Sequence, residues 1–384
     1  MKKLLLLLSL GLLPFALLWA QRSQRDLLPK VNEDGSVTFH LRAPKAVKVE
    51  VIGSWGSTLP LTEGENGVWE VTTPPLESDM YFYRFSVDGM IGLDPRNPFT
   101  KRDVNTVFSV FYVDGPQADL YKVQDVPHGT VVAQWYHSQA TGVDRRMNIY
   151  LPPTYDGKKK FPVLYLLHGS GNDEDGWLEL GSTARIMDNL IAQGRAVPMI
   201  VVMPNGNIGA QAAPGRTKDN LDFYPVGSDR IPNAYADKGI TFENSFREIV
   251  QWTDRNLCTI PRKDRRAVAG LSMGGGHTFQ IAINYPELFD YYGLFSAGFR
   301  QLTAEDSDRA FKEFDAGLRN LSKVGYRLYW IEIGKDDFLY ERNIRLLRSM
   351  DYLGFKYEYT ETSGGHSWSN WRKYLSEFAP RLFR

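Results

Sequence analysis

Two patterns of hydrophobic and polar positions divide the chain. In its first third, short segments alternate apolar with polar residues and are separated by turn residues. Alternation with a period of two is typical of strands that bury one face. The segments are Val37–Leu41, Ala46–Val51, Val68–Val71 and Met80–Phe85. This spacing predicts a small all-β sandwich of antiparallel strands over residues 24–115.

The pattern changes after residues 116–128, which we interpret as a linker. The next segments predict a hairpin whose two strands, Val131–Tyr136 and Arg146–Leu151, are joined by a polar turn. Beyond them, apolar runs without polar alternation are separated by stretches with helical periodicity. The runs are Val163–Leu167, Met199–Met203, Arg266–Ala269, Tyr292–Ser296 and Leu328–Glu332. Strands buried on both faces and joined by helices predict a doubly wound α/β sheet over residues 129–384.

Composition adds limits on the partners. The 384 residues suit two domains, and 45 basic residues balance 45 acidic ones. This balance gives no overall field for nucleic acid or an anionic membrane surface, so we expect no nucleic acid and no stable membrane partner. Aromatic residues make up 13% of the chain, a content that suits sugar-stacking or aryl-binding surfaces as well as ordinary core packing.

The amino-terminal segment has the pattern of an export signal. Met1-Lys2-Lys3 precedes an apolar run from Leu4 to Leu18, and the run is shorter than a comfortable membrane span. We expect residues 1–20 to be a cleaved signal peptide and the protein to be periplasmic or secreted; an uncleaved anchor is the alternative.

The segment from Ala267 to Gly276 carries the main chemical signal. An apolar strand runs into Gly270-Leu271-Ser272-Met273-Gly274 and then into a helix-competent stretch. A G-x-S-x-G sequence between a strand and a helix predicts a nucleophile elbow, in which Ser272 stands above the sheet edge. The alternative is a glycine-rich turn in which this serine merely caps the helix.

Chain order supports the elbow. An α/β-hydrolase supplies its serine, acid and histidine in that order, each after a later strand. Here Gly334-Lys335-Asp336-Asp337 follows a predicted strand, and His366 lies in a glycine-hinged loop before the last helix. Upstream, His168-Gly169-Ser170-Gly171 follows the strand Val163–Leu167, where an oxyanion loop belongs. The order of serine, acid and histidine along the chain does not by itself distinguish Asp336 from Asp337.

Together these motifs resemble carbohydrate esterase family 1, the feruloyl, acetylxylan and esterase D-like enzymes. The resemblance covers about the last two-thirds of the chain and implies an α/β-hydrolase fold. In that family the acid follows the glycine by three positions, which implies Asp337 rather than Asp336. The resemblance also implies a carboxylic ester hydrolase acting through an acyl-enzyme.

The first domain resembles carbohydrate-binding module 48, a family of early-set, immunoglobulin-like modules of the starch-domain type. The matching residues include Ile52–Trp55, Gly67–Trp69, Tyr81–Gly89 and Asp94–Pro98. Such domains bind glycan or only pack beside a catalytic domain. We leave glycan binding by Trp55 open and expect Trp69 to be a core residue.

Each group of the constellation has an expected task. His366 would deprotonate Ser272, and Asp337 would orient the imidazole. The backbone N–H groups of Met273 and Ser170 would bind the oxyanion. This chemistry requires no cofactor and no metal, and the histidines show no H-x-x-x-H spacing.

Substrate contacts are less specific in the sequence. We expect His168, Gly169, Trp177 and Tyr224 to contact substrate, although a structural role in holding the loop suits His168 better. The acidic run Asp173–Asp175 is typical of a solvated loop, with Trp177 beside it at the substrate mouth.

The leading functional hypothesis is removal of feruloyl or related groups from acylated xylan or arabinoxylan of the plant cell wall. Acetylxylan esterase shares every catalytic residue and is the close rival. Siderophore esterases of the enterochelin type, a non-catalytic glycan-binding protein and acyl transfer are further alternatives. The sequence leaves the oligomeric state open.

Overall fold

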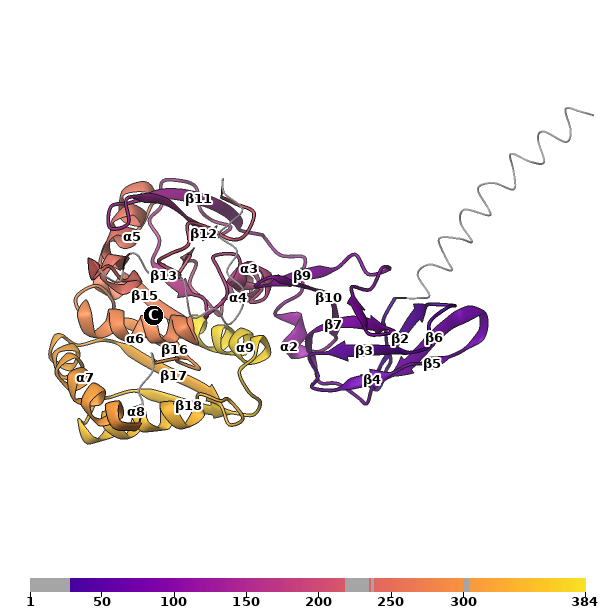
Figure 1. The fold of residues 1–384 in the computed structure, drawn as a ribbon. Helices are drawn as coiled ribbons and strands as arrows, with labels where there is room; N and C mark the ends of the chain where they lie inside the picture. The colour runs from indigo at the N-terminus through magenta and orange to yellow at the C-terminus, as the bar shows by residue number, and fades with distance from the viewer. Residues whose placement is uncertain (1–27, 218–234, 236–237, 300–303) are drawn as a thin grey trace, which may run out of the picture. The chain divides into compact units, whose positions relative to one another are not determined.

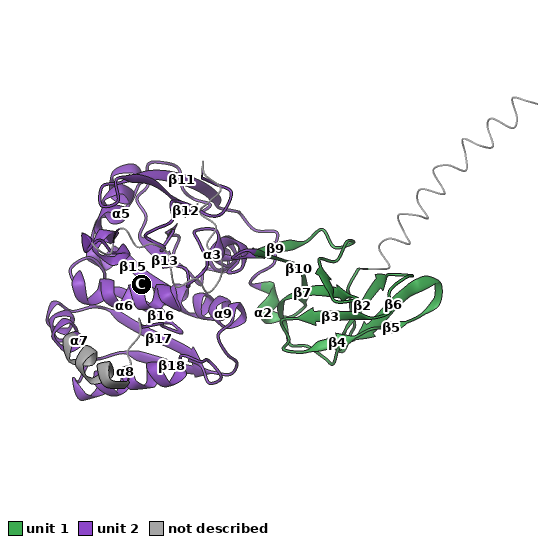
Figure 2. Ribbon diagram, viewed as in Figure 1, with its two compact units in different colours: residues 1–102, 106–119 green, residues 103–105, 120–384 purple. Residues whose placement is uncertain are grey.

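The protein is described here by a computed structural model that covers residues 28–217, 235, 238–299 and 304–384. It divides into two compact units (Figure 2): residues 1–102 with 106–119, and residues 103–105 with 120–384. The division at residues 119 and 120 falls within the segment interpreted as a linker, which begins with the short helix α2 (Pro116–Asp119). The predicted signal peptide lies outside the described residues, and no helix among those described is long and apolar enough to cross a bilayer.

Unit 1 is the predicted all-β domain. Its described strands form two antiparallel sheets, one in the order β1-β2-β6-β5 and the other in the order β4-β3-β7-β10-β9, with β8 paired to β7. The strands are β1 (Lys30–Val31), β2 (Val37–Arg42), β3 (Val49–Gly53), β4 (Thr58–Pro60), β5 (Thr62–Glu63), β6 (Val68–Thr72), β7 (Asp79–Val87), β8 (Met90–Gly92), β9 (Thr100–Asp103) and β10 (Thr106–Val113).

An aromatic cluster fills the core of unit 1. The ring of Phe39 contacts those of Tyr83 and Phe111, with centroids 4.9 and 5.5 Å apart. Trp69 is buried and its indole N–H donates to the Ala43 carbonyl, which confirms its predicted core role. Trp55 is half-buried and packs on Phe39 at 5.5 Å, so part of its surface serves this core.

Unit 2 is the predicted α/β domain. Its sheet runs in the order β11-β12-β14-β13-β15-β16-β17-β18, with β11 and β12 antiparallel and the strands from β14 to β18 parallel (Figure 1). The strands are β11 (Thr130–Ser138), β12 (Val143–Leu151), β13 (Val163–Leu167), β14 (Ile200–Pro204), β15 (Arg266–Leu271), β16 (Tyr291–Phe295), β17 (Leu328–Gly334) and β18 (Glu358–Thr362).

Helices cover both faces of this sheet, as the unbroken apolar strands predict. On one face α5 packs on α6, α6 on α7 and α7 on α8; α4 and α9 pack together on the other. The helices are α3 (Gly176–Glu179), α4 (Thr183–Ala192), α5 (Phe242–Asn256), α6 (Met273–Asn284), α7 (Ala304–Val324), α8 (Tyr340–Tyr352) and α9 (Trp368–Phe378). The reversal of strand order beside β13 and β15 creates the crevice where α/β sheets place their sites.

One ionisable side chain lies inside this packing. Glu332 occupies the fully buried strand β17, beneath the loop that carries the predicted acid. Burial raises the pKa of Glu332 to about 9, and the nearby carboxylate of Glu377 acts in the same direction. The side chain is therefore protonated at neutral pH, a form that a neutral glutamine reproduces.

We predict that Glu332→Gln stabilises the protein increasingly as the pH rises. The folded-state pKa lies above the unfolded one, so wild-type stability from this group is present below about pH 4.5 and is lost toward pH 9. At pH 8 we expect a gain of about 1–3 kcal/mol in the free energy of unfolding. Urea denaturation at pH 5 and pH 8 measures it, with exposed Glu341→Gln as the matched control. Equal curves for wild type and variant at pH 8 would contradict the assignment.

Candidate active site

Ser272 lies in a strained turn between the last residue of β15 and the first residue of α6. Its backbone angles are φ 50° and ψ −115°, a region that costs a residue with a side chain about 1–3 kcal/mol. Two hydrogen bonds hold the turn: the Ser272 N–H donates to the Phe295 carbonyl at 2.9 Å, and the Gly298 N–H donates to the Ser272 carbonyl at 2.7 Å. This is the geometry of a nucleophile elbow.

The glycines on either side of Ser272 are required by close packing. A Cβ on Gly270 would lie 2.4 Å from the Gly274 backbone, and one on Gly274 would lie 2.4 Å from the Leu167 carbonyl oxygen. Side chains at either position would displace the backbone of β13 or α6. The G-x-S-x-G spacing therefore lets α6 start directly against the sheet.

The loop after β13 passes beside the serine. A Cβ on Gly169 would lie 3.3 Å from the Ser272 Cβ, so this backbone borders the nucleophile directly. Ser170 follows as an exposed residue. Met273 is the first residue of α6, where backbone N–H groups have no partner within the helix and face anions favourably. The two residues expected to supply the oxyanion donors thus belong to the two backbone segments that border Ser272, Ser170 to the loop after β13 and Met273 to the start of α6.

His168 holds this loop from below. It is buried, its Nδ1 lies 2.8 Å from the Gly169 carbonyl oxygen, and its Nε2 accepts the Gly206 N–H at 2.7 Å. These partners require the neutral ring with its proton on Nδ1. Burial lowers the pKa of His168 to about 4, which keeps that form at neutral pH. Of the two roles considered for His168, the structure supports the structural one.

The predicted acid and histidine meet at the carboxyl ends of β17 and β18. Asp337 Oδ2 lies 2.8 Å from His366 Nδ1, whereas Asp336 is exposed and points no carboxylate at this ring. The other carboxylate oxygen of Asp337 accepts the Leu339 N–H at 2.8 Å. Of the two aspartates that chain order left open, Asp337 is therefore the one that is hydrogen-bonded to His366.

The environment of Asp337 favours its charged form. Burial raises the pKa of this carboxyl, but hydrogen bonds from His366, the Leu339 backbone and Ser296 lower it further, and the net pKa lies below the ordinary value. Ser296 is itself buried and accepts the indole N–H of Trp371 at 3.2 Å. A charged, firmly held carboxylate is what orients an imidazole for proton transfer.

Two aromatic rings flank the imidazole of His366. Phe338 lies 4.5 Å from it between centroids and Trp371 lies 4.8 Å away in an edge-on arrangement. Phe338 is 73% exposed, which is unusual for a phenylalanine and leaves an apolar surface open beside the histidine. Sequence reasoning missed Phe338, although its place directly after the acid was a usable signal.

Two further residues, Trp177 and Tyr224, were expected to contact substrate. Trp177 is only 1% exposed, donates its indole N–H to the Leu167 carbonyl at 2.9 Å, and packs edge-on against Trp368. It is a core residue beneath the oxyanion loop, which corrects the expectation that it lines the substrate mouth. Tyr224 lies outside the described residues.

The acidic run Asp173–Asp175 is not the solvated loop that the sequence predicts, because Asp173 and Glu174 are buried. Glu174 is buried and accepts hydrogen bonds from Arg146 Nη1 at 2.7 Å, Asn205 Nδ2 at 2.9 Å and the Ala213 N–H at 2.8 Å. Asp175 accepts a second bond from Arg146 at 2.9 Å. A buried carboxylate needs such partners, and this set joins β12, the oxyanion loop and the loop after β14.

The elbow, the acid–histidine pair and the parallel sheet that carries them define an α/β-hydrolase fold, and the family comparisons agree. Residues 138–382 match the profile of the family described as "Putative esterase", and residues 27–98 match carbohydrate-binding module 48, the isoamylase N-terminal domain. The first match spans well over half of the chain, which therefore belongs to this esterase family and is a carboxylic ester hydrolase.

Individual relatives extend the likeness. The chain is 32% identical over 371 residues to an endo-1,4-beta-xylanase/feruloyl esterase of Xylanibacter ruminicola, covering 93% of this chain and 46% of that protein. The chain thus spans about half the length of this curated relative. Among solved structures, a ferulic acid esterase shares 27% identity and a TM-score of 0.52 over 67% of this chain and 99% of its own. The enterobactin esterase of Shigella flexneri shares the fold, with 17% identity and a TM-score of 0.64 over 92% of this chain and 95% of its own.

We predict that His168→Gln makes stability less sensitive to acid. The depressed folded-state pKa means that the stability from neutral His168 is fully present above about pH 6.5 and is lost as the pH falls toward 4. Glutamine does not titrate, although the lost bond to Gly169 costs about 1 kcal/mol at pH 7.5. Urea denaturation at pH 7.5 and pH 5 compares the two proteins. A parallel loss of stability in both would contradict this role.

Proposed function

We propose that this protein is an exported serine esterase that removes feruloyl or related hydroxycinnamoyl groups from acylated plant xylan. The main support for this choice of substrate is the 32% identity to a xylanase/feruloyl esterase across 93% of this chain, both units included. The acid–histidine pair lies at the same edge of the sheet as the Ser272 elbow, after the parallel strands β17 and β18, and this supports the chemistry. The export signal expected at residues 1–20 suits a substrate outside the cytoplasm.

The proposed reaction uses two acyl transfers. His366 Nε2 takes the proton of Ser272 Oγ as that oxygen bonds to the ester carbonyl carbon, while Asp337 holds the Nδ1 proton. The N–H groups of Met273 and Ser170 bind the oxyanion. The ester C–O bond then breaks, His366 protonates the leaving sugar oxygen, and the acyl group remains on Ser272. Water repeats these steps, releases the free acid and restores the serine.

An aromatic acyl group fits the surroundings of the histidine. Phe338 exposes its ring beside His366, and the ring of Trp371 also contacts the imidazole. A hydroxycinnamoyl ring can bury apolar area on such a surface, whereas an acetyl group buries little. This exposed ring favours ferulate over the acetylxylan alternative. The siderophore alternative has only the fold in its support, at 17% identity.

The first test measures ferulate and acetate released from arabinoxylan by wild type and Ser272→Ala. We expect ferulate release by wild type and a loss of at least about 10³-fold in the variant, because the nucleophile is removed. Acetate release alone would replace the feruloyl proposal with the acetylxylan one. Ferulate release unchanged in Ser272→Ala would contradict the assignment of the nucleophile.

The second test separates the neighbouring aspartates. Asp337→Asn should lower kcat on methyl ferulate by about 10³–10⁴-fold, because the amide no longer orients or stabilises the protonated imidazole. Asp336→Asn is the matched control, since Asp336 is exposed, and its kcat should stay within about twofold of wild type. Circular dichroism confirms folding of both variants. The reverse ranking of the two variants would overturn the triad.

A further inference from the structure

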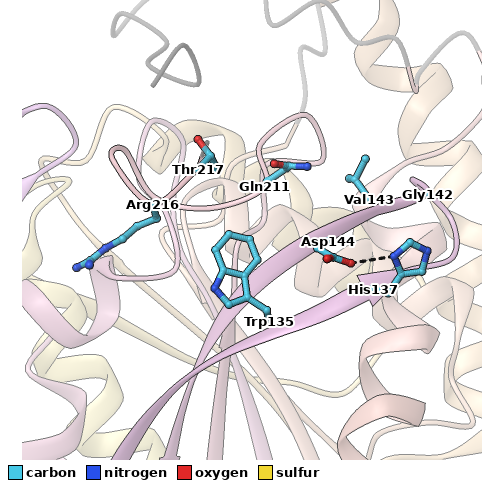
Figure 3. Close-up of a pocket in the computed structure, with 8 residues that line it drawn as sticks. All are labelled: Trp135, His137, Gly142, Val143, Asp144, Gln211, Arg216 and Thr217. Atoms are coloured by element: carbon cyan, nitrogen blue, oxygen red, sulfur yellow. Dashed lines mark hydrogen bonds and ion pairs between the residues drawn. The ribbon is translucent and has the colours of Figure 1, made fainter. Parts of the chain in front are cut away.

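A groove with an exposed tryptophan lies on unit 2 away from Ser272. Trp135 and His137 of β11, Asp144 of β12, and Gln211, Arg216 and Thr217 of the loop after β14 line a hollow of about 460 Å³ (Figure 3). The indole of Trp135 rises from the strand toward the loop that carries Gln211 and Thr217. It is 41% exposed, while the next residue, Tyr136, turns inward to the core.

The lining suits a sugar chain. A pyranose ring has an apolar C–H face, which an indole face can cover, and hydroxyl groups at its edge, which need hydrogen-bond partners. His137 Nδ1 and Asp144 Oδ1 lie 2.9 Å apart at one end of the groove, and both side chains are more than half exposed. Gln211 and Arg216 of the loop after β14 also line the groove and carry hydrogen-bond donors. One exposed aromatic ring with donors and acceptors around it can therefore contact both the face and the edge of a sugar ring.

The groove opens at the edge of the sheet that carries the catalytic residues. Met147 pairs with Pro204, so the start of β12 and the end of β11 lie at the carboxyl ends of the parallel strands. Three to four strand spacings separate the hairpin from β15, or about 14–19 Å at 4.8 Å per strand. A short oligosaccharide spans such a distance.

A buried polar frame joins the groove to the oxyanion loop. The loop after β14 donates the Gly206 N–H to His168 near its start, and the Gln211 carbonyl accepts the Arg146 N–H at 2.8 Å. Arg146 is also paired with Glu174, which accepts the Ala213 N–H. The wall that carries Gln211 is therefore fixed relative to Gly169 and Ser170.

We propose that this groove, the Trp135 groove, binds the sugar backbone of the acylated polysaccharide at a point remote from the ester that is cleaved. The inference rests on the proposed function for the identity of the polymer. The groove adds affinity for the polysaccharide and leaves the chemistry at Ser272 unchanged. Loss of the groove therefore lowers activity on the polymeric substrate and leaves activity on a small ester unchanged.

Kinetics on two substrates test the groove. For Trp135→Ala, kcat/KM on feruloylated arabinoxylan should fall about tenfold, while kcat/KM on methyl ferulate should stay within about twofold. Trp135→Phe keeps a flat ring and should recover most of the loss. Tyr352→Ala is the matched control, because Tyr352 is an aromatic residue that is 84% exposed on α8. Equal activity of Trp135→Ala and wild type on the polymer would overturn the proposal.

Direct binding separates the groove from the proposed function. Ser272→Ala protein is titrated with unsubstituted xylohexaose, with and without Trp135→Ala, and tryptophan fluorescence or calorimetry reports binding. If Ser272→Ala protein binds xylohexaose and the added Trp135→Ala substitution abolishes this binding, the groove is supported. This holds even if wild type releases no ferulate, because that result contradicts only the proposed function. Identical binding by both proteins overturns the groove. A change from dimer to monomer in Trp135→Ala, with unchanged xylohexaose binding, would instead assign this surface to contact between copies of the chain.

Discussion

The strained backbone of Ser272 is the constraint on which the rest of the site depends. Its φ of 50° is held because the Phe295 carbonyl at the end of β16 accepts the Ser272 N–H, and the Gly298 N–H donates to the Ser272 carbonyl. The same turn starts α6 and so aims the first N–H groups of that helix. Strain of this size persists only where the surrounding structure determines it. The neighbouring strands, which pack without polar alternation, supply that rigidity.

Much of this arrangement could be predicted because it follows from chain order and backbone geometry. The G-x-S-x-G glycines, the run at Gly334 and the hinge before His366 are local signals, and parallel strands bring their carboxyl ends to one edge. The period-two segments of the first unit were equally readable, and Trp69 is in its core as expected. The hairpin before β13 was visible from its polar turn.

The rest depends on packing that no local pattern records. Trp177 and Glu174 sit in a stretch that is polar in sequence, yet both are buried, because Leu167 offers a carbonyl to the indole and Arg146 neutralises the carboxylate. These partners lie 10 residues away for Trp177 and 28 residues away for Glu174, outside the local pattern. Phe338 is the opposite case, an apolar residue left exposed beside His366. Neither residue type nor neighbouring sequence is therefore a sufficient measure of burial.

Buried ion pairs contribute little to stability when compared with apolar packing, but they fix geometry where several elements must keep one register. The Arg146–Glu174 pair does so between β12, the oxyanion loop and the loop after β14. Removing one partner would leave an unpaired charge in the interior, which costs about 3–5 kcal/mol. The proposed function requires this rigidity: with an ester at Ser272 and a sugar chain several strands away, a small shift between the two points would misplace the ester carbonyl relative to the proposed oxyanion donors.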